Sequence, residues 1–157
     1  PAARDVNGYY GNCEYKNYHD CDGTPMYPFG YGLSYSVFEI GKIEADSKEI
    51  TLGEIEKGEC FEFTVNIKNI SDTAGSEVVQ LYIHDKTATM SRPLRELKGY
   101  RKIMLEPGES KDVVFKIGFK ELGFYNANGN FAVERGEFDV FIGRDSYAEK
   151  AATVEVI

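Results

Sequence analysis

Strict alternation of apolar and polar side chains over residues 61–68 constrains this chain more than any other feature. A period of two residues matches extended backbone, in which successive side chains point to opposite faces, and does not match the 3.6-residue period of a helix. The apolar members are Phe61, Phe63, Val65 and Ile67, and the polar members are Glu62, Thr64, Asn66 and Lys68. This segment is therefore predicted to be a strand with one face in the core and one in water.

Similar strand patterns recur along the chain at short intervals. A first strand is predicted from Val37, and Ile50 and Leu52 are expected to continue it after a break near Asp46. Further strands are predicted at 79–84, 97–105, 113–119, 124–125, 131–133, 138–142 and 152–156, with one helical turn at 120–123. Between them lie turn signals such as Glu106-Pro107-Gly108 and the Asn-Gly pair at 128–129.

About seven or eight short strands with no long helix predict an all-β fold, in which two antiparallel sheets pack face to face. The chain has no Trp, so the Cys-Trp-Cys spacing of a disulfide-pinned immunoglobulin domain is absent. The pattern fits a fibronectin type III-like β-sandwich of about seven strands better. We expect the sandwich to occupy residues 37–157, after an irregular, aromatic-rich linker over residues 1–36.

The stretch from Pro25 to Tyr35 marks the joint between these two parts. Its two prolines and two glycines exclude a helix interior, and its side chains do not alternate as in a strand. A stiff, extended segment with turns at Gly30 and Gly32 is predicted. Its large apolar and aromatic side chains need a surface to pack against, either on the sandwich or on a neighbouring domain.

Charge and hydropathy exclude several classes of partner. The net charge of −8 argues against nucleic acid and anionic membranes, because both require a basic face. No stretch approaches the roughly 20 apolar residues of a membrane span, and no signal peptide is visible. The chain starts at Pro1 without Met, which suggests a processed protein or a fragment of a longer one. These features indicate no particular cellular compartment.

One cluster in the first part of the chain has metal-binding residue types. Cys13, His19, Asp20, Cys21 and Asp22 lie within ten residues, but the Cys spacing does not match a zinc site, and Asp20 and Asp22 lack the later Glu of a calcium loop. We therefore predict no metal and no cofactor. The sequence leaves open whether Cys13 and Cys21 form a disulfide.

No catalytic residue is predicted in this chain. Most carboxylates that a glycosidase mechanism could use fall on the polar faces of predicted strands, where we expect them to be solvated: Glu62, Glu77, Asp112, Asp139 and Glu155. The two histidines, His19 and His84, have no nucleophile in a supporting context.

Two surface features remain open at this stage. Arg92, Arg95 and Lys98 lie beside Glu96 in an otherwise acidic chain. They form either a solvated loop with local ion pairs or a docking surface for an acidic neighbour. Asn69-Ile70-Ser71 has the form of a glycosylation acceptor, which has meaning only in a secreting eukaryotic host.

Four stretches together carry a family resemblance. They read Tyr-Pro-Phe-Gly-Tyr-Gly-Leu-Ser-Tyr (27–35), Val-Gln-Leu-Tyr-Ile (79–83), Arg-Pro-Leu-Arg-Glu-Leu-Lys-Gly-Tyr (92–100) and Leu-Glu-Pro-Gly-Glu-Ser (105–110). In this order they resemble the C-terminal fibronectin type III-like domain of glycoside hydrolase family 3, which includes β-glucosidases and β-xylosidases. The resemblance runs from about residue 25 to near the C-terminus.

The resemblance implies an accessory, non-catalytic domain that packs on and stabilises the catalytic domains of its parent chain. The parent would be a retaining glycosidase that uses two carboxylates in other domains and no cofactor, and carbohydrate would be contacted only through it. The expected interdomain contacts are Tyr27, Phe29, Tyr31, Tyr35, Arg92, Glu96 and Lys98. The alternative is an independent carbohydrate- or surface-binding module, against which stands the lack of Trp and of a regular aromatic row.

Overall fold

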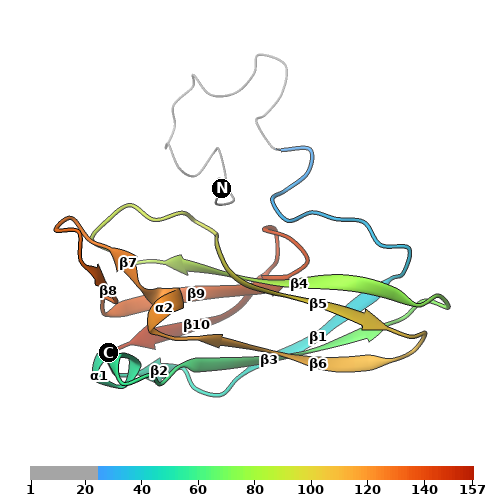
Figure 1. The fold of residues 1–157 in the computed structure, drawn as a ribbon, viewed down its shortest axis with the longest axis horizontal. Helices are drawn as coiled ribbons and strands as arrows, with labels where there is room; N and C mark the ends of the chain where they lie inside the picture. The colour runs from blue at the N-terminus through green and yellow to red at the C-terminus, as the bar shows by residue number, and fades with distance from the viewer. Residues whose placement is uncertain (1–24) are drawn as a thin grey trace, which may run out of the picture.

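The computed structural model describes residues 25–157 as two packed β-sheets (Figure 1). The smaller sheet has the order β1-β3-β6, with strands β1 (Phe38–Ala45), β3 (Phe61–Asn69) and β6 (Ser110–Ile117). All its strands are antiparallel, and Phe63 of β3 pairs with both Ala45 and Phe115. The sandwich predicted from the alternating pattern is confirmed.

The larger sheet has five strands in the order β2-β10-β9-β4-β5. These are β2 (Glu49–Ile50), β10 (Lys150–Val156), β9 (Gly136–Gly143), β4 (Gly75–Asp85) and β5 (Glu96–Leu105). Its pairs are antiparallel except for the short β2–β10 pair. A separate hairpin is formed by β7 (Phe124–Tyr125) and β8 (Phe131–Ala132).

The core lies between the sheets and consists of the inward-facing residues of the alternating strands. Its fully buried members include Phe61, Phe63, Val65, Ile67, Val79, Leu81, Leu105, Ile117, Phe138 and Val140. Each large apolar side chain removed from water contributes about 1.5–3 kcal/mol, so this shared layer is the main stabilising contact between the sheets.

Two strand predictions are wrong at their ends. Neither Ile50 nor Leu52 continues the first strand: Ile50 lies in β2 of the larger sheet, and Leu52 begins α1 (Leu52–Glu56). A capping box fixes this start, because Thr51 Oγ1 accepts from the Glu54 N–H and Glu54 Oε2 accepts from the Thr51 N–H. Likewise Phe119 belongs to the one-turn helix α2 (Phe119–Leu122), not to the preceding strand.

Strand β4 departs from simple alternation because both of its faces are covered. Val79, Leu81 and Ile83 face the core as predicted, but Gln80 and Tyr82 on the opposite face are buried as well. β4 is an inner strand between β9 and β5, and its neighbours in the sheet do not cover its outer face. Chain segments outside the sandwich therefore pack on this face.

Asn69, the potential glycosylation acceptor, is a buried structural residue. Its Nδ2 donates to the carbonyls of Thr73 (2.9 Å) and Leu105 (3.1 Å), and its Oδ1 accepts from the N–H and hydroxyl of Ser71. Both amide hydrogens are used inside the fold, so a glycan on this nitrogen is incompatible with it.

Among residues 25–157, no helix has the length and apolar character needed to cross a membrane.

We expect Asn69→Ala to lower the free energy of unfolding by about 2–3 kcal/mol, because it removes, from a fully buried site, the donor to the Leu105 carbonyl and the acceptor for Ser71. Urea unfolding measures this loss. The control is Asn66→Ala on the same strand, since exposed Asn66 donates only to Asp112; its loss should be below about 1 kcal/mol. Equal losses in the two variants would contradict a structural role for Asn69.

Candidate functional site

The segment Pro25–Tyr35 crosses the outer face of the larger sheet, above β4 in Figure 1. Gln80 of β4 fixes it by donating from Nε2 to the carbonyl of Gly30 (2.9 Å) and to that of Arg144. The Tyr82 hydroxyl donates to Gln80 Oε1 (2.5 Å) and so orients this amide. The Ser146 N–H donates to the carbonyl of Phe29 (2.9 Å). Gln80 and Tyr82 of β4 are therefore the anchor of the segment.

Gly30 is required at this anchor for two reasons. Its φ of +82° lies in the left-handed region that side chains rarely adopt. A Cβ at this position would also lie 2.1 Å from Gln80 Oε1 and 2.6 Å from the Tyr82 hydroxyl. The backbone thus approaches the sheet more closely than any other residue type permits.

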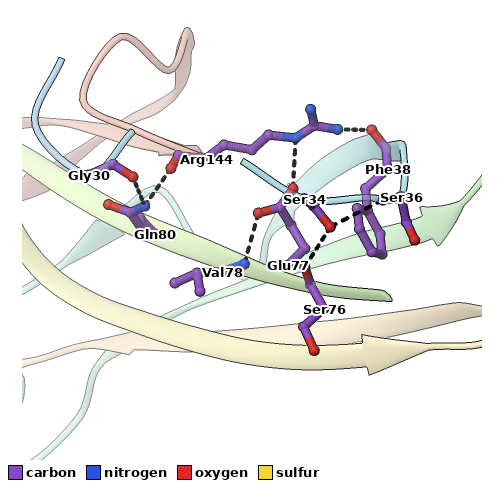
Figure 2. A network of polar contacts seen from close by, with 9 residues as sticks. All are labelled: Gly30, Ser34, Ser36, Phe38, Ser76, Glu77, Val78, Gln80 and Arg144. Atoms are coloured by element: carbon purple, nitrogen blue, oxygen red, sulfur yellow. Dashed lines mark hydrogen bonds and ion pairs between the residues drawn. The ribbon is translucent and has the colours of Figure 1, made fainter. Parts of the chain in front are cut away.

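A second set of contacts ties down the end of the segment, as Figure 2 shows. Ser34 Oγ donates to the carbonyl of Ser76 (3.1 Å), and Ser36 Oγ donates to that of Thr73 (2.8 Å). Arg144 pairs with Glu77 (3.3 Å) and donates to the carbonyl of Phe38. These bonds join the segment, β4 and the loop after β9 into one network.

Tyr82 is buried beneath this segment, and the ring of Phe29 meets its ring edge-on at 6.5 Å. Burial raises the pKa of Tyr82 to about 12, with a further rise from the charge of Asp145 and an opposing effect from Arg95. The hydroxyl therefore stays protonated at physiological pH and remains a hydrogen-bond donor to Gln80.

The opposite side of the segment exposes its large side chains. Met26 is 86% exposed, Leu33 is 89% exposed and Tyr35 is fully exposed. Tyr27 and Tyr31 are also exposed and stack on each other with ring centroids 5.0 Å apart. We call Met26, Tyr27, Tyr31, Leu33 and Tyr35 the apolar face. Of the predicted contact residues on this segment, Phe29 packs toward the sheet, while Tyr27, Tyr31 and Tyr35 point away from it.

The predicted contacts at the end of the β4–β5 loop and the start of β5 are paired with one another. Glu96 binds both Arg92 (2.5 Å) and Lys98 (2.8 Å), and the Arg92 guanidinium lies 4.9 Å from the centroid of the Phe124 ring. All three charged side chains are mostly buried. Local ion pairing, one of the two interpretations left open, is therefore present. Whether the loop also meets a neighbour stays a prediction.

Arg95 connects this loop to the segment, and the sequence had singled it out only as a cation. Its guanidinium lies 3.6 Å from the centroid of the Phe141 ring. It also donates to the carbonyls of Ser146 (2.8 Å) and Ala148 (2.5 Å). Ser146 in turn donates to Phe29, so the turn at 144–148 joins both sets of predicted contacts. No short-range pattern in the sequence could have paired residues 50 positions apart.

Asp85 lies at the end of β4, where its carboxylate is largely removed from water. It is buried, its Oδ1 accepts from the Thr87 N–H (3.1 Å), and its Oδ2 has no hydrogen-bond partner in the described part of the chain. Burial raises the pKa of this carboxyl, and the backbone N–H of Thr87 partly opposes the rise.

The prediction that the strand carboxylates are solvated is wrong for two of them. Glu77 is mostly buried and pairs with Arg144, and Asp139 is mostly buried and binds Thr153 Oγ1 (2.6 Å) and Lys150 (3.4 Å). Glu77 is covered by Arg144 from the loop after β9, and Asp139 is covered by its neighbours on β10, whereas Asp112 is exposed. Both carboxylates are engaged in ion pairs and hydrogen bonds, not free for acid or base chemistry.

These contacts hold the segment, the β4–β5 loop and the turn at 144–148 together on the larger sheet. Among residues 25–157, no group of three or more His, Cys, Asp and Glu side chains gathers where it could hold a metal ion. The candidate ligands at Cys13, His19, Asp20, Cys21 and Asp22 lie outside the described residues.

The sheet order and the Greek-key-like crossovers define a fibronectin type III-like sandwich. Comparison with known families agrees, since residues 77–146 match the fibronectin type III-like domain. The chain is 39% identical over 140 residues to a periplasmic β-glucosidase of Salmonella typhimurium, covering 89% of this chain and 18% of the relative. It is 42% identical over 141 residues to a putative β-xylosidase of Formosa agariphila, covering 90% and 18%.

A solved structure gives the same result. A β-glucosidase from Erythrobacter marinus superimposes with a TM-score of 0.81 at 37% identity, covering 92% of this chain and 18% of that one. The chain is thus a fibronectin type III-like domain of the kind present in glycoside hydrolase family 3. It spans less than a fifth of the length of these relatives.

We expect Gly30→Ala to release the segment from the sheet at a cost of about 2 kcal/mol or more, because the new Cβ meets the Gln80 amide in a strained backbone conformation. Hydrogen exchange measures this as lost protection of the Ser146 N–H. Gly32→Ala is the matched control, since nothing lies within 4 Å of its Cβ position. Unchanged protection in Gly30→Ala would contradict the anchor.

Proposed function

We propose that this domain is an accessory domain of a family 3 glycoside hydrolase, and that it packs on the catalytic domains of its parent chain and stabilises them. The parent would hydrolyse terminal β-linked sugars with a retaining mechanism, using carboxylates that lie outside this chain. The domain itself would take no part in the chemistry. Its partners would be the catalytic domains, and sugar would be bound only by them.

The main support for this proposal is the apolar face, because it lies on a segment that hydrogen bonds fix to the sheet. The segment that carries the apolar face is held in place by hydrogen bonds to Gln80 and Ser76, and Ser36 just after it is held by a bond to Thr73. A set of large apolar side chains kept in fixed positions in water favours a partner surface that covers them. Each one that becomes fully buried would contribute about 1.5–3 kcal/mol.

The lengths of the relatives support the same arrangement. The matching region is 18% of a β-glucosidase and 18% of a putative β-xylosidase, so in those proteins the domain is joined to a much longer remainder. A segment that leads into the sandwich and is fixed on its sheet would bring the apolar face close to a domain that precedes it. The proposed boundary, a linker over residues 1–36 before a sandwich over 37–157, belongs to this proposal.

The double variant Leu33→Ser/Tyr35→Ser tests whether the apolar face packs on the catalytic domains. In the isolated chain both side chains are exposed, so the melting temperature should change by less than about 1 °C. In the parent protein the same change should lower the melting temperature by several degrees, because it removes apolar contacts with the catalytic domains.

The control is Tyr125→Ser on the β7–β8 hairpin, where a similarly exposed tyrosine lies away from the segment. Because Tyr125 contacts only Phe131 on its own hairpin among the described ring pairs, its substitution should change the melting temperature of both proteins by the same amount. An unaltered parent carrying Leu33→Ser/Tyr35→Ser would contradict the proposal. If that variant instead weakened binding of the isolated chain to a polysaccharide, the independent binding module would be the better account.

A further inference from the structure

A groove of about 400 Å³ lies beside the apolar face on the outer side of the larger sheet. Residues 30–33 of the segment form one wall. The floor comes from β4 through Ser76, Glu77, Val78 and Gln80, and two cations, Lys102 and Arg144, complete the lining. Because the apolar face and the groove share Tyr31 and Leu33, a domain that covers one reaches the other.

The charges in this groove are unbalanced. Glu77 is its only lining carboxylate, and both oxygens are engaged, Oε2 with Arg144 (3.3 Å) and Oε1 with the Val78 N–H (2.9 Å). Arg144 also donates to the carbonyl of Phe38, so its guanidinium is paired. Lys102 forms no ion pair within residues 25–157 and is exposed. The groove therefore carries one uncompensated positive charge.

Apolar side chains flank this charge on the same face of β5. Ser76 pairs with Met104, Val78 with Lys102 and Gln80 with Tyr100, so the three β5 side chains lie in a row on the outer face of the sheet. Tyr100 and Met104 are both more than 60% exposed. A partner that fits here needs one group that accepts a hydrogen bond from the Lys102 ammonium, with apolar groups on either side that contact Tyr100 and Met104.

We propose that the catalytic part of the parent chain places an aspartate or glutamate in this groove, where its carboxylate pairs with Lys102 between Tyr100 and Met104. This inference rests on the proposed function, because it names the chemistry of the partner at that interface. Covering Lys102 with an apolar surface would remove an ammonium from water without compensation, which is strongly unfavourable. A carboxylate supplies both the opposite charge and the acceptor.

A second copy of this chain does not fit the groove equally well. In a symmetric pair, the same patch of each copy meets its equivalent, so two positively charged grooves would face each other. The charge of the groove therefore favours an acidic segment over self-association.

Substitutions at Lys102 in the parent protein test this inference. Lys102→Met keeps the length of the side chain and removes the charge, so it should lower the melting temperature of the parent by about 2 °C or more. Lys102→Arg keeps the charge and should stay within about 1 °C of the wild type. In the isolated chain neither variant should shift the melting temperature by more than about 1 °C.

Lys111→Met on β6 is the control, because exposed Lys111 lies on the other sheet. An unchanged or raised melting temperature of the parent with Lys102→Met would overturn the inference and indicate an apolar or solvated contact. If Leu33→Ser/Tyr35→Ser destabilises the parent while Lys102→Met does not, the inferred carboxylate at Lys102 is wrong, but the proposed packing on the catalytic domains stands. If neither does, the proposed function fails as well.

Discussion

The contact between Gly30 and the buried amide of Gln80 is the constraint on which the outer face of this domain depends. The Gln80 amide is held by Tyr82 and donates to two carbonyls, one on each of the segments that cross the sheet. Without those carbonyls, β4 would bury an amide and a phenol with too few partners, a cost of about 1–3 kcal/mol for each unsatisfied group. The sheet therefore requires its covering segments, and the segments require a glycine where they approach it.

This dependence explains how one extended segment can be part of the fold and, as we propose, also a surface for another domain. The carbonyl of Gly30 accepts from Gln80 of β4, while the side chains of the apolar face point away from the sheet. Arg95 extends the same arrangement, since it ties the β4–β5 loop to the turn at 144–148 that also holds Phe29. A rigid sandwich core positions the network, and the network positions the apolar face and the groove with Lys102.

Local patterns predicted much of the fold but less of the site. Alternation at Phe61–Lys68 and the Glu-Pro-Gly turn were sufficient for the strands of the smaller sheet, because one side of that sheet faces water. Alternation failed as a guide at Gln80 and Tyr82, because the cover on this face of β4 comes from residues distant in the sequence. It failed at Glu77 and Asp139 because the fold brings basic partners to them, from the loop after β9 and from β10. Leu52 was assigned wrongly although the capping box of Thr51 and Glu54 was visible. The pairing of Glu96 with Arg92 and Lys98 follows local spacing, whereas the role of Arg95 requires the fold.

The central claim is that the apolar face is exposed in this chain and covered in its parent. Hydroxyl-radical footprinting, read by mass spectrometry, compares side-chain accessibility in the two proteins directly. The account predicts strong labelling of Met26, Leu33 and Tyr35 in the isolated chain and marked protection of all three in the parent, with Tyr125 labelled equally in both. Equal labelling of Met26, Leu33 and Tyr35 in the two proteins would contradict it.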